Sequence, residues 1–169
     1  MIVLVPIGDI DFAVLESLRQ PLAAVYREEV VIGKSLPLPP ESLNPEGRQN
    51  DAEAILESIP NASRGARSLG IADVDLFVRG LNFVFGLADD AGSRALISLW
   101  RLRQEAYGLP RDDLLFRRRA LTEAVHELGH AHGLGHCSST SCVMHFSNSL
   151  SETDAKGCEF CFDCRRKME

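Results

Sequence analysis

Apolar positions in the first part of the chain form two different patterns. Residues 2–7 form a continuous apolar run of the length of a buried strand. Apolar residues then recur at helical spacing, and Asp9 or Asp11 can cap a helix that runs to about residue 26. The predicted stripe consists of Phe12, Leu15, Leu18, Leu22 and Val25. Residues 30–32 are a short second strand.

The middle of the chain predicts shorter elements. Four prolines make residues 36–50 a surface excursion with little regular structure. We expect a helix over residues 51–58, continuing weakly toward residue 69, and a third strand over residues 74–78. Residues 82–87 and 94–100 flank Asp89-Asp90-Ala91-Gly92, which predicts a hairpin.

A long helix is expected from Asp112 or Asp113 to Gly133, because either carboxylate suits an N-cap. The order of elements predicts an α/β fold in which the two long helices pack on a mixed five-stranded sheet. At 169 residues the chain is expected to be a single domain. Residues 1–133 would carry the sheet and this helix, and residues 134–169 the functional segment described next.

The candidate chemistry is concentrated at the end of that helix. His126 and His130 lie four residues apart, so both imidazoles face one side of the helix and can bind one metal ion, with Glu127 beside the metal. Gly133 can leave the helix with positive φ, which returns the chain so that His136 becomes a third ligand. Three histidines leave one tetrahedral position of zinc open, as in catalytic sites.

Two further histidines are interpreted differently. His132 points away from the face that His126 and His130 share, so we expect it to be a solvated histidine or a partner behind the ligands. His145 is expected to be a local packing or hydrogen-bonding residue.

A second constellation is formed by cysteines. Thiolate pairs two to four residues apart, separated by a longer loop, are typical of a closed structural zinc site, here Cys137, Cys142, Cys161 and Cys164. Two disulfides are the alternative. The opening strand has no features of an export signal, which favours a reducing cytosol and therefore zinc. Cys158 is either a free thiol or a replacement for Cys161.

These motifs resemble a known family. The pattern His126-Glu127…His130…Gly133…His136 is similar to that of the metzincins, and Met144 falls where the clan has its Met-turn methionine. The cysteine spacing resembles specifically that of the archaemetzincins. The resemblance implies a small zinc metallopeptidase with two zinc ions, one catalytic and one structural. It also implies four parallel strands and one antiparallel edge strand beside the cleft.

Residues 82–86 are the candidate for that edge. An exposed edge strand can bind an extended peptide through main-chain hydrogen bonds. Asn82, Phe83, Val84 and Phe85 are therefore candidate substrate-binding residues. The alternative is that Phe83 and Phe85 pack in the core while the edge is covered.

Composition narrows the partners. The net charge of −6 argues against nucleic acid, and no apolar run reaches the length needed to span a membrane. We expect a cytoplasmic monomer that acts on a peptide or protein substrate.

The predicted mechanism is peptide-bond hydrolysis by a zinc-bound water that Glu127 deprotonates. Met144 would pack beneath the three imidazoles. The enzyme is expected to be a peptidase, with aminopeptidase action as a special case in which Glu152, Asp154 or Glu159 holds the substrate amine. The alternatives are a zinc-bearing protein-binding module with vestigial catalysis and a zinc amidohydrolase of narrow specificity.

Overall fold

The computed structural model describes residues 1–169 except 45, 47, 64, 90, 91 and 169. Its main sheet has the order β2-β1-β5-β9-β8. These strands are β1 (Ile2–Ile7), β2 (Val30–Ile32), β5 (Arg67–Ala72), β8 (Gly86–Ala88) and β9 (Arg94–Ser98). The first four in this order pair in parallel, and β8 pairs antiparallel with β9. The expected mixed five-stranded sheet with one antiparallel edge strand is confirmed.

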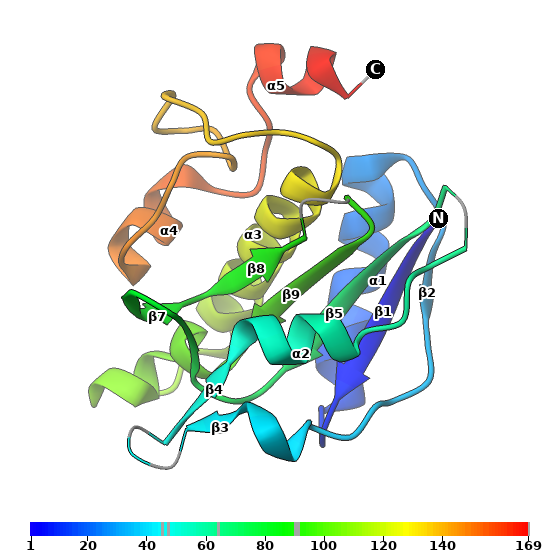
Figure 1. Ribbon diagram of the computed structural model, residues 1–169. Helices are drawn as coiled ribbons and strands as arrows, with labels where there is room; N and C mark the ends of the chain where they lie inside the picture. Colours follow the sequence, from blue (N-terminus) through cyan, green and yellow to red (C-terminus); the bar gives the residue numbers. More distant parts are fainter. Residues whose placement is uncertain (45, 47, 64, 90–91, 169) are drawn as a thin grey trace.

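Helices cover both faces of this sheet (Figure 1). Helices α1 (Phe12–Tyr26) and α3 (Asp113–Ala131) lie on one face, and α2 (Ala52–Ser58) lies on the other. Side chains of a strand alternate between its two faces. In β1, Ile2 and Leu4 accordingly join the core under α1 and α3, while Val5 and Ile7 pack with the residues of α2.

The two long helices begin and end where local chemistry requires. The Asp11 carboxylate accepts a hydrogen bond from the Ala13 N–H at 2.9 Å, and the Asp112 carboxylate accepts one from the Leu115 N–H at 2.9 Å. Each bond satisfies a backbone donor that the first helical turn leaves unpaired. Helix α3 ends just before Gly133, whose φ of 83° lies in the left-handed region.

The central strand β5 differs from the expectation, because a helical continuation toward residue 69 was predicted there. The residue at the middle of β5 is Gly70, where an added Cβ would lie 2.4 Å from Ile59 Cδ1. Close packing of α2 against the sheet therefore requires a glycine, and that glycine interrupts the apolar pattern of a buried strand. The expected third strand over residues 74–78 is confined to β6 (Leu76–Val78), which lies outside the main sheet.

A second, four-stranded sheet was not predicted. Its order is β3-β4-β6-β7, and it contains β3 (Leu43–Asn44), β4 (Gln49–Asp51) and β7 (Leu81–Val84) besides β6. The expectation of little regular structure over residues 36–50 was therefore wrong. The prediction that residues 82–86 form the edge strand was wrong in position. Residues 82–84 belong to β7 of the second sheet, and the edge of the main sheet is β8. The β8–β9 hairpin is confirmed, although Asp90 and Ala91 of its turn lie outside the described residues.

The segment after α3 runs along the end of that helix and contains α4 (Leu150–Lys156) and α5 (Phe162–Lys167), drawn in orange and red in Figure 1. Short 3-10 turns, η1 (Pro40–Ser42), η2 (Trp100–Leu102) and η3 (Gln104–Tyr107), complete the described elements. Within the described part of the chain, no helix combines the length and apolar character that crossing a membrane requires.

Candidate metal centres and active-site cleft

Three histidines converge at the C-terminal end of α3. His126 and His130 project from successive turns of the helix, and the chain reverses after Gly133 to bring His136 back to them. One ring nitrogen of each histidine lies within 4.8 Å of the corresponding atoms of the other two. The Nε2 atoms of His126 and His130 are 3.2 Å apart. The structure thus brings together the three residues that the spacing predicted as ligands.

Backbone carbonyls orient two of these imidazoles. His126 Nδ1 lies 2.7 Å from the Val143 carbonyl oxygen, and His130 Nδ1 lies 2.8 Å from that of Leu134. A carbonyl oxygen only accepts, so each Nδ1 carries the proton and each Nε2 keeps its lone pair. Burial lowers the pKa of all three histidines, most strongly that of His126. Three neutral imidazoles aimed at one point fit a zinc ion with an open position.

Glu127 is directed into the same space and is almost completely buried, with 6% of its surface exposed. Burial raises its pKa well above the usual range, and the neighbouring charge of Glu123 acts in the same direction. A backbone feature makes room for this side chain. A Cβ added to Gly86 of the edge strand would lie 2.6 Å from Glu127 Cγ and 2.5 Å from the Leu96 carbonyl oxygen.

Met144 lies beneath the helix that carries the histidines. It is fully buried, and its Sδ atom is 2.4 Å from where a Cβ of Gly129 would be. Gly129 therefore allows the thioether to approach the helix backbone between the two histidine-bearing turns. This contact is with the helix backbone, and the role of Met144 as a floor under the imidazoles stays a prediction.

The second predicted constellation is also assembled. Sulfur atoms of Cys137, Cys142, Cys161 and Cys164 lie within 4.8 Å of one another, and none of the cysteines forms a disulfide. The Cys161 backbone N–H donates to Cys142 Sγ at 3.3 Å. A hydrogen bond from the Cys164 backbone lowers the pKa of the Cys161 thiol to about 7. Four clustered thiols fit a closed tetrahedral zinc site. Cys158 lies outside this group, so the geometry gives no support for its replacing Cys161.

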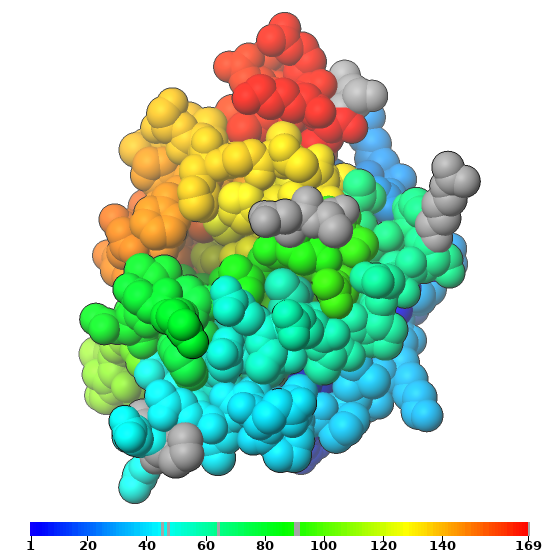
Figure 2. Space-filling view, viewed as in Figure 1, coloured from blue at the N-terminus to red at the C-terminus, as the bar shows by residue number. Residues whose placement is uncertain are grey.

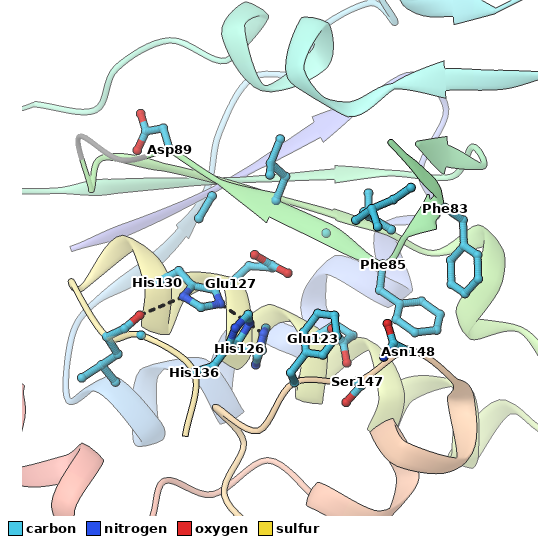
Figure 3. A pocket seen from close by; sticks show the side chains of 18 of the residues that line it. Phe83, Phe85, Asp89, Glu123, His126, Glu127, His130, His136, Ser147 and Asn148 are labelled. Atoms are coloured by element: carbon cyan, nitrogen blue, oxygen red, sulfur yellow. Dashed lines mark hydrogen bonds between the residues drawn. The ribbon is translucent and has the colours of Figure 1, made fainter. Parts of the chain in front are cut away.

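A cavity of about 750 Å³ opens beside the histidines. In the orientation of Figure 3, its upper wall comes from β7 and β8 and its lower wall from the segment after Met144. Figure 2 shows these two parts adjoining, in green and orange, with the orange segment uppermost. The four candidate substrate-binding residues all line it: Asn82, Phe83, Val84 and Phe85. Phe85 is nevertheless largely buried, so part of the alternative core role also applies.

Several lining residues were not predicted from the sequence. Glu123, Ser147 and Asn148 lie opposite Phe83 and Phe85, as Figure 3 shows. Glu123 lies three residues before His126 and four before Glu127, which places it on the same helix face. This spacing is the signal from which Glu123 could have been predicted as a lining residue. Ser147 and Asn148 reach the cleft only through the fold of the C-terminal segment.

Buried polar contacts join α3 to α4 behind the cleft. Lys156 Nζ, on a side chain with no exposure, lies 3.2 Å from Glu123 Oε1 and donates to the His145 carbonyl oxygen at 3.3 Å. It also lies 3.3 Å from His126 Nδ1, without a hydrogen bond, because both atoms carry protons. Thr153 Oγ1 donates to the same Glu123 oxygen at 3.0 Å. These contacts fix the segment that forms the lower wall of the cleft relative to the helix that carries the histidines.

The remaining histidines and acids have structural partners. His132 stacks on Tyr26 and lies 3.2 Å from Glu28 Oε1, while His145 Nδ1 bonds to the Cys137 carbonyl oxygen at 2.9 Å. Both therefore lie outside the histidine trio, as expected. None of the three acids proposed to hold a substrate amine lines the cavity. Glu152 bonds to Ser149 at the start of α4, and Asp154 forms a two-pronged ion pair with Arg119.

Comparisons with known proteins agree with this geometry. The sequence model of Peptidase family M54 matches residues 53–169. The archaemetzincin of Pyrococcus abyssi is 42% identical over 177 aligned residues, covering 100% of this chain and 94% of the relative. The crystal structure of archaemetzincin from Archaeoglobus fulgidus complexed with malonate has a TM-score of 0.87 at 34% identity and covers 99% of both chains. A zinc-dependent peptidase from Methanocorpusculum labreanum has a TM-score of 0.90 at 27% identity, with 100% of both chains covered.

Proposed function

Since this chain belongs to peptidase family M54, the archaemetzincins, it is a zinc metallopeptidase, and we propose that Glu127 is its general base. His126, His130 and His136 would hold the catalytic zinc. The observation that carries the proposal is the convergence of three neutral imidazoles beside a buried carboxylate that faces the same cavity.

When bound by the three imidazoles, zinc would supply Lewis acidity toward the scissile carbonyl and would lower the pKa of a bound water to about 7. The Glu127 carboxylate takes the proton of the attacking water and delivers it to the leaving amine. Its burial strengthens its hydrogen bond to that water, because little bulk water competes for the same oxygen atoms. Gly86 keeps the space that the carboxylate occupies free of a side chain.

We propose a second, structural zinc at Cys137, Cys142, Cys161 and Cys164, giving two ions per chain. All four cysteines belong to the segment after His136, and four thiolate bonds would tie the two ends of that segment to each other. The Met144 floor and the lower wall of the cleft both belong to this segment. The structural site would therefore support the catalytic site as well as the fold, and residues 1–133 and 134–169 would act as parts of one domain.

The proposed substrate is a peptide or protein, bound by a monomer in the cytosol. The five unpaired thiols suit a reducing compartment, and the net charge of −6 gives no attraction toward nucleic acid.

An aminopeptidase needs a carboxylate that is available to the substrate amine. Three described carboxylates line the cavity, and only Glu127 has no ion-pair partner: Asp89 is bound by Arg94, and Glu123 is paired with Lys156. Glu127 is already assigned as the general base, so no lining carboxylate among the described residues is left to bind a substrate amine. We therefore propose cleavage within peptide chains, with amino-terminal trimming as the alternative outcome.

The experiment is digestion of a diverse peptide mixture by zinc-loaded protein, read by mass spectrometry beside a chelator-treated sample. New internal termini in the zinc-loaded sample alone support an endopeptidase, and stepwise loss of first residues supports the aminopeptidase. An unchanged mixture, with zinc measured in the same sample, would exclude a general peptidase.

A further inference from the structure

We infer that the half of the cleft between Phe85 and Glu123 is a subsite for a large neutral side chain with a hydroxyl at its tip, as in tyrosine. Glu123 and Ser147 would determine this selectivity. The inference rests on the proposed function, because it names the class of substrate that the same cleft takes.

The walls of this subsite suit a flat apolar group. The rings of Phe83 and Phe85 are 5.3 Å apart in an edge-to-face arrangement. The Arg101 guanidinium lies 4.3 Å from the centre of the Phe83 ring and is itself ion-paired with Asp75, which fixes that ring from outside the cleft. Phe146 adds an exposed ring 4.9 Å from His136. Aromatic side chains pack favourably in such edge-to-face surroundings.

The far end of the subsite is polar, as Figure 3 shows by the positions of Glu123, Ser147 and Asn148. Glu123 Oε1 is held by Lys156 and Thr153, and the Glu123 side chain lines the cavity. Ser147 Oγ is buried and has no hydrogen-bond partner in the described part of the chain. A buried hydroxyl without a partner is costly, so a ligand group that bonds to it is favoured.

Charge restricts the class of ligand. Lys156 already neutralises Glu123, so a cationic substrate group would meet an ammonium directly behind the carboxylate. A substrate carboxylate would find no free cation here, because the Lys156 ammonium is already paired with Glu123. A phenol avoids both, because it donates its O–H to Glu123 Oε2 and accepts from the Ser147 hydroxyl once that side chain turns about its Cα–Cβ bond.

The test is a cycle of two peptides and two proteins. The peptides differ only in having tyrosine or phenylalanine beside the cleaved bond, and the pair is made once for each side of that bond. The proteins are zinc-loaded wild type and Ser147→Ala. We expect the tyrosine peptide to be preferred in kcat/KM by about three- to tenfold, the value of one net hydrogen bond. This ratio should fall in Ser147→Ala, which leaves only the bond to Glu123, and stay unchanged in Ser151→Ala, an exposed serine outside the cavity.

Binding is measured in parallel so that the subsite is tested without turnover. The dissociation constants of both peptides are determined for zinc-loaded Glu127→Gln with and without Ser147→Ala. Equal affinity for the two peptides, or a preference that Ser147→Ala leaves unchanged, would overturn the inference. A preference in binding without any cleavage by wild type would support the subsite and contradict the proposed function.

Discussion

Gly86→Ala tests how closely the edge strand approaches the catalytic carboxylate. The added methyl would lie 2.5 Å from the Leu96 carbonyl oxygen and 2.7 Å from Glu127 Oε1, well inside the 3.4 Å at which ordinary contact begins. Because one of these atoms belongs to the backbone of the partner strand β9, the clash cannot be relieved by turning a side chain alone. Either β8 moves away from β9, or Glu127 is displaced.

The expected magnitude follows from competing effects. Overpacking of this kind costs about 1–3 kcal/mol, which exceeds the about 0.4–1 kcal/mol that replacing a glycine gains through the unfolded chain. We expect a net loss of stability and a fall in melting temperature of about 2–4 °C for each kcal/mol lost. A displacement of Glu127 by about 1 Å would lower kcat/KM about 100-fold.

The assay combines thermal unfolding, zinc content and kcat/KM on one peptide. Gly135→Ala is the matched control, because Gly135 also lines the cavity but has nothing within 4 Å of an added Cβ. Its loss of activity should be much smaller. If Gly86→Ala kept wild-type stability and activity, the close approach of β8 to Glu127 would be refuted as a functional constraint.

Three further predictions concern the supports of the site. Lys156→Met should lower the free energy of unfolding by about 3–5 kcal/mol, because it leaves the buried Glu123 carboxylate unpaired, and a double Lys156→Met, Glu123→Leu variant should recover much of this loss in urea unfolding. Cys164→Ser should remove one zinc per chain and expose the segment after α3 to limited proteolysis; unaltered zinc content would contradict a second site. Burial by itself raises the pKa of Asp89, but hydrogen bonds from Arg94 and the neighbouring backbone hold it below its usual range. Its contribution is therefore present above the unfolded pKa of about 3.9 and lost as pH falls through the folded value, so the stability difference between wild type and Asp89→Asn should shrink on acidification from pH 7 to 3.

Much of the fold follows from local patterns. Strand β1 is a continuous apolar run and helices α1 and α3 begin at aspartate caps, so their positions and the α/β class could be predicted from the sequence. Strand β5 could not, because its pattern is set by a partner: Gly70 is there to admit Ile59, and Ser68 is buried while bonding to the Pro60 carbonyl oxygen. The second sheet escaped prediction because its strands have two to four residues, too few for a period.

The candidate site shows the same division. The histidine and cysteine sets depend on fixed spacings along one helix and one segment, so they could be predicted. The walls of the cleft depend on tertiary packing, which brings Ser147 and Asn148 opposite Phe83. Lys156 gave no signal, since a lysine on a short helix is ordinarily exposed, and only the fold shows that its ammonium lies buried beside His126.

The most direct test of the account is the hydrolysis rate of Glu127→Gln, measured with the zinc content of the same samples. The change removes the base but keeps the shape of the side chain and leaves all three histidines in place. We expect two zinc ions per chain in both proteins and a loss of about 10²–10⁴-fold in kcat for the variant. A variant that keeps its zinc and hydrolyses peptides at the wild-type rate would contradict the assignment of Glu127 as the base.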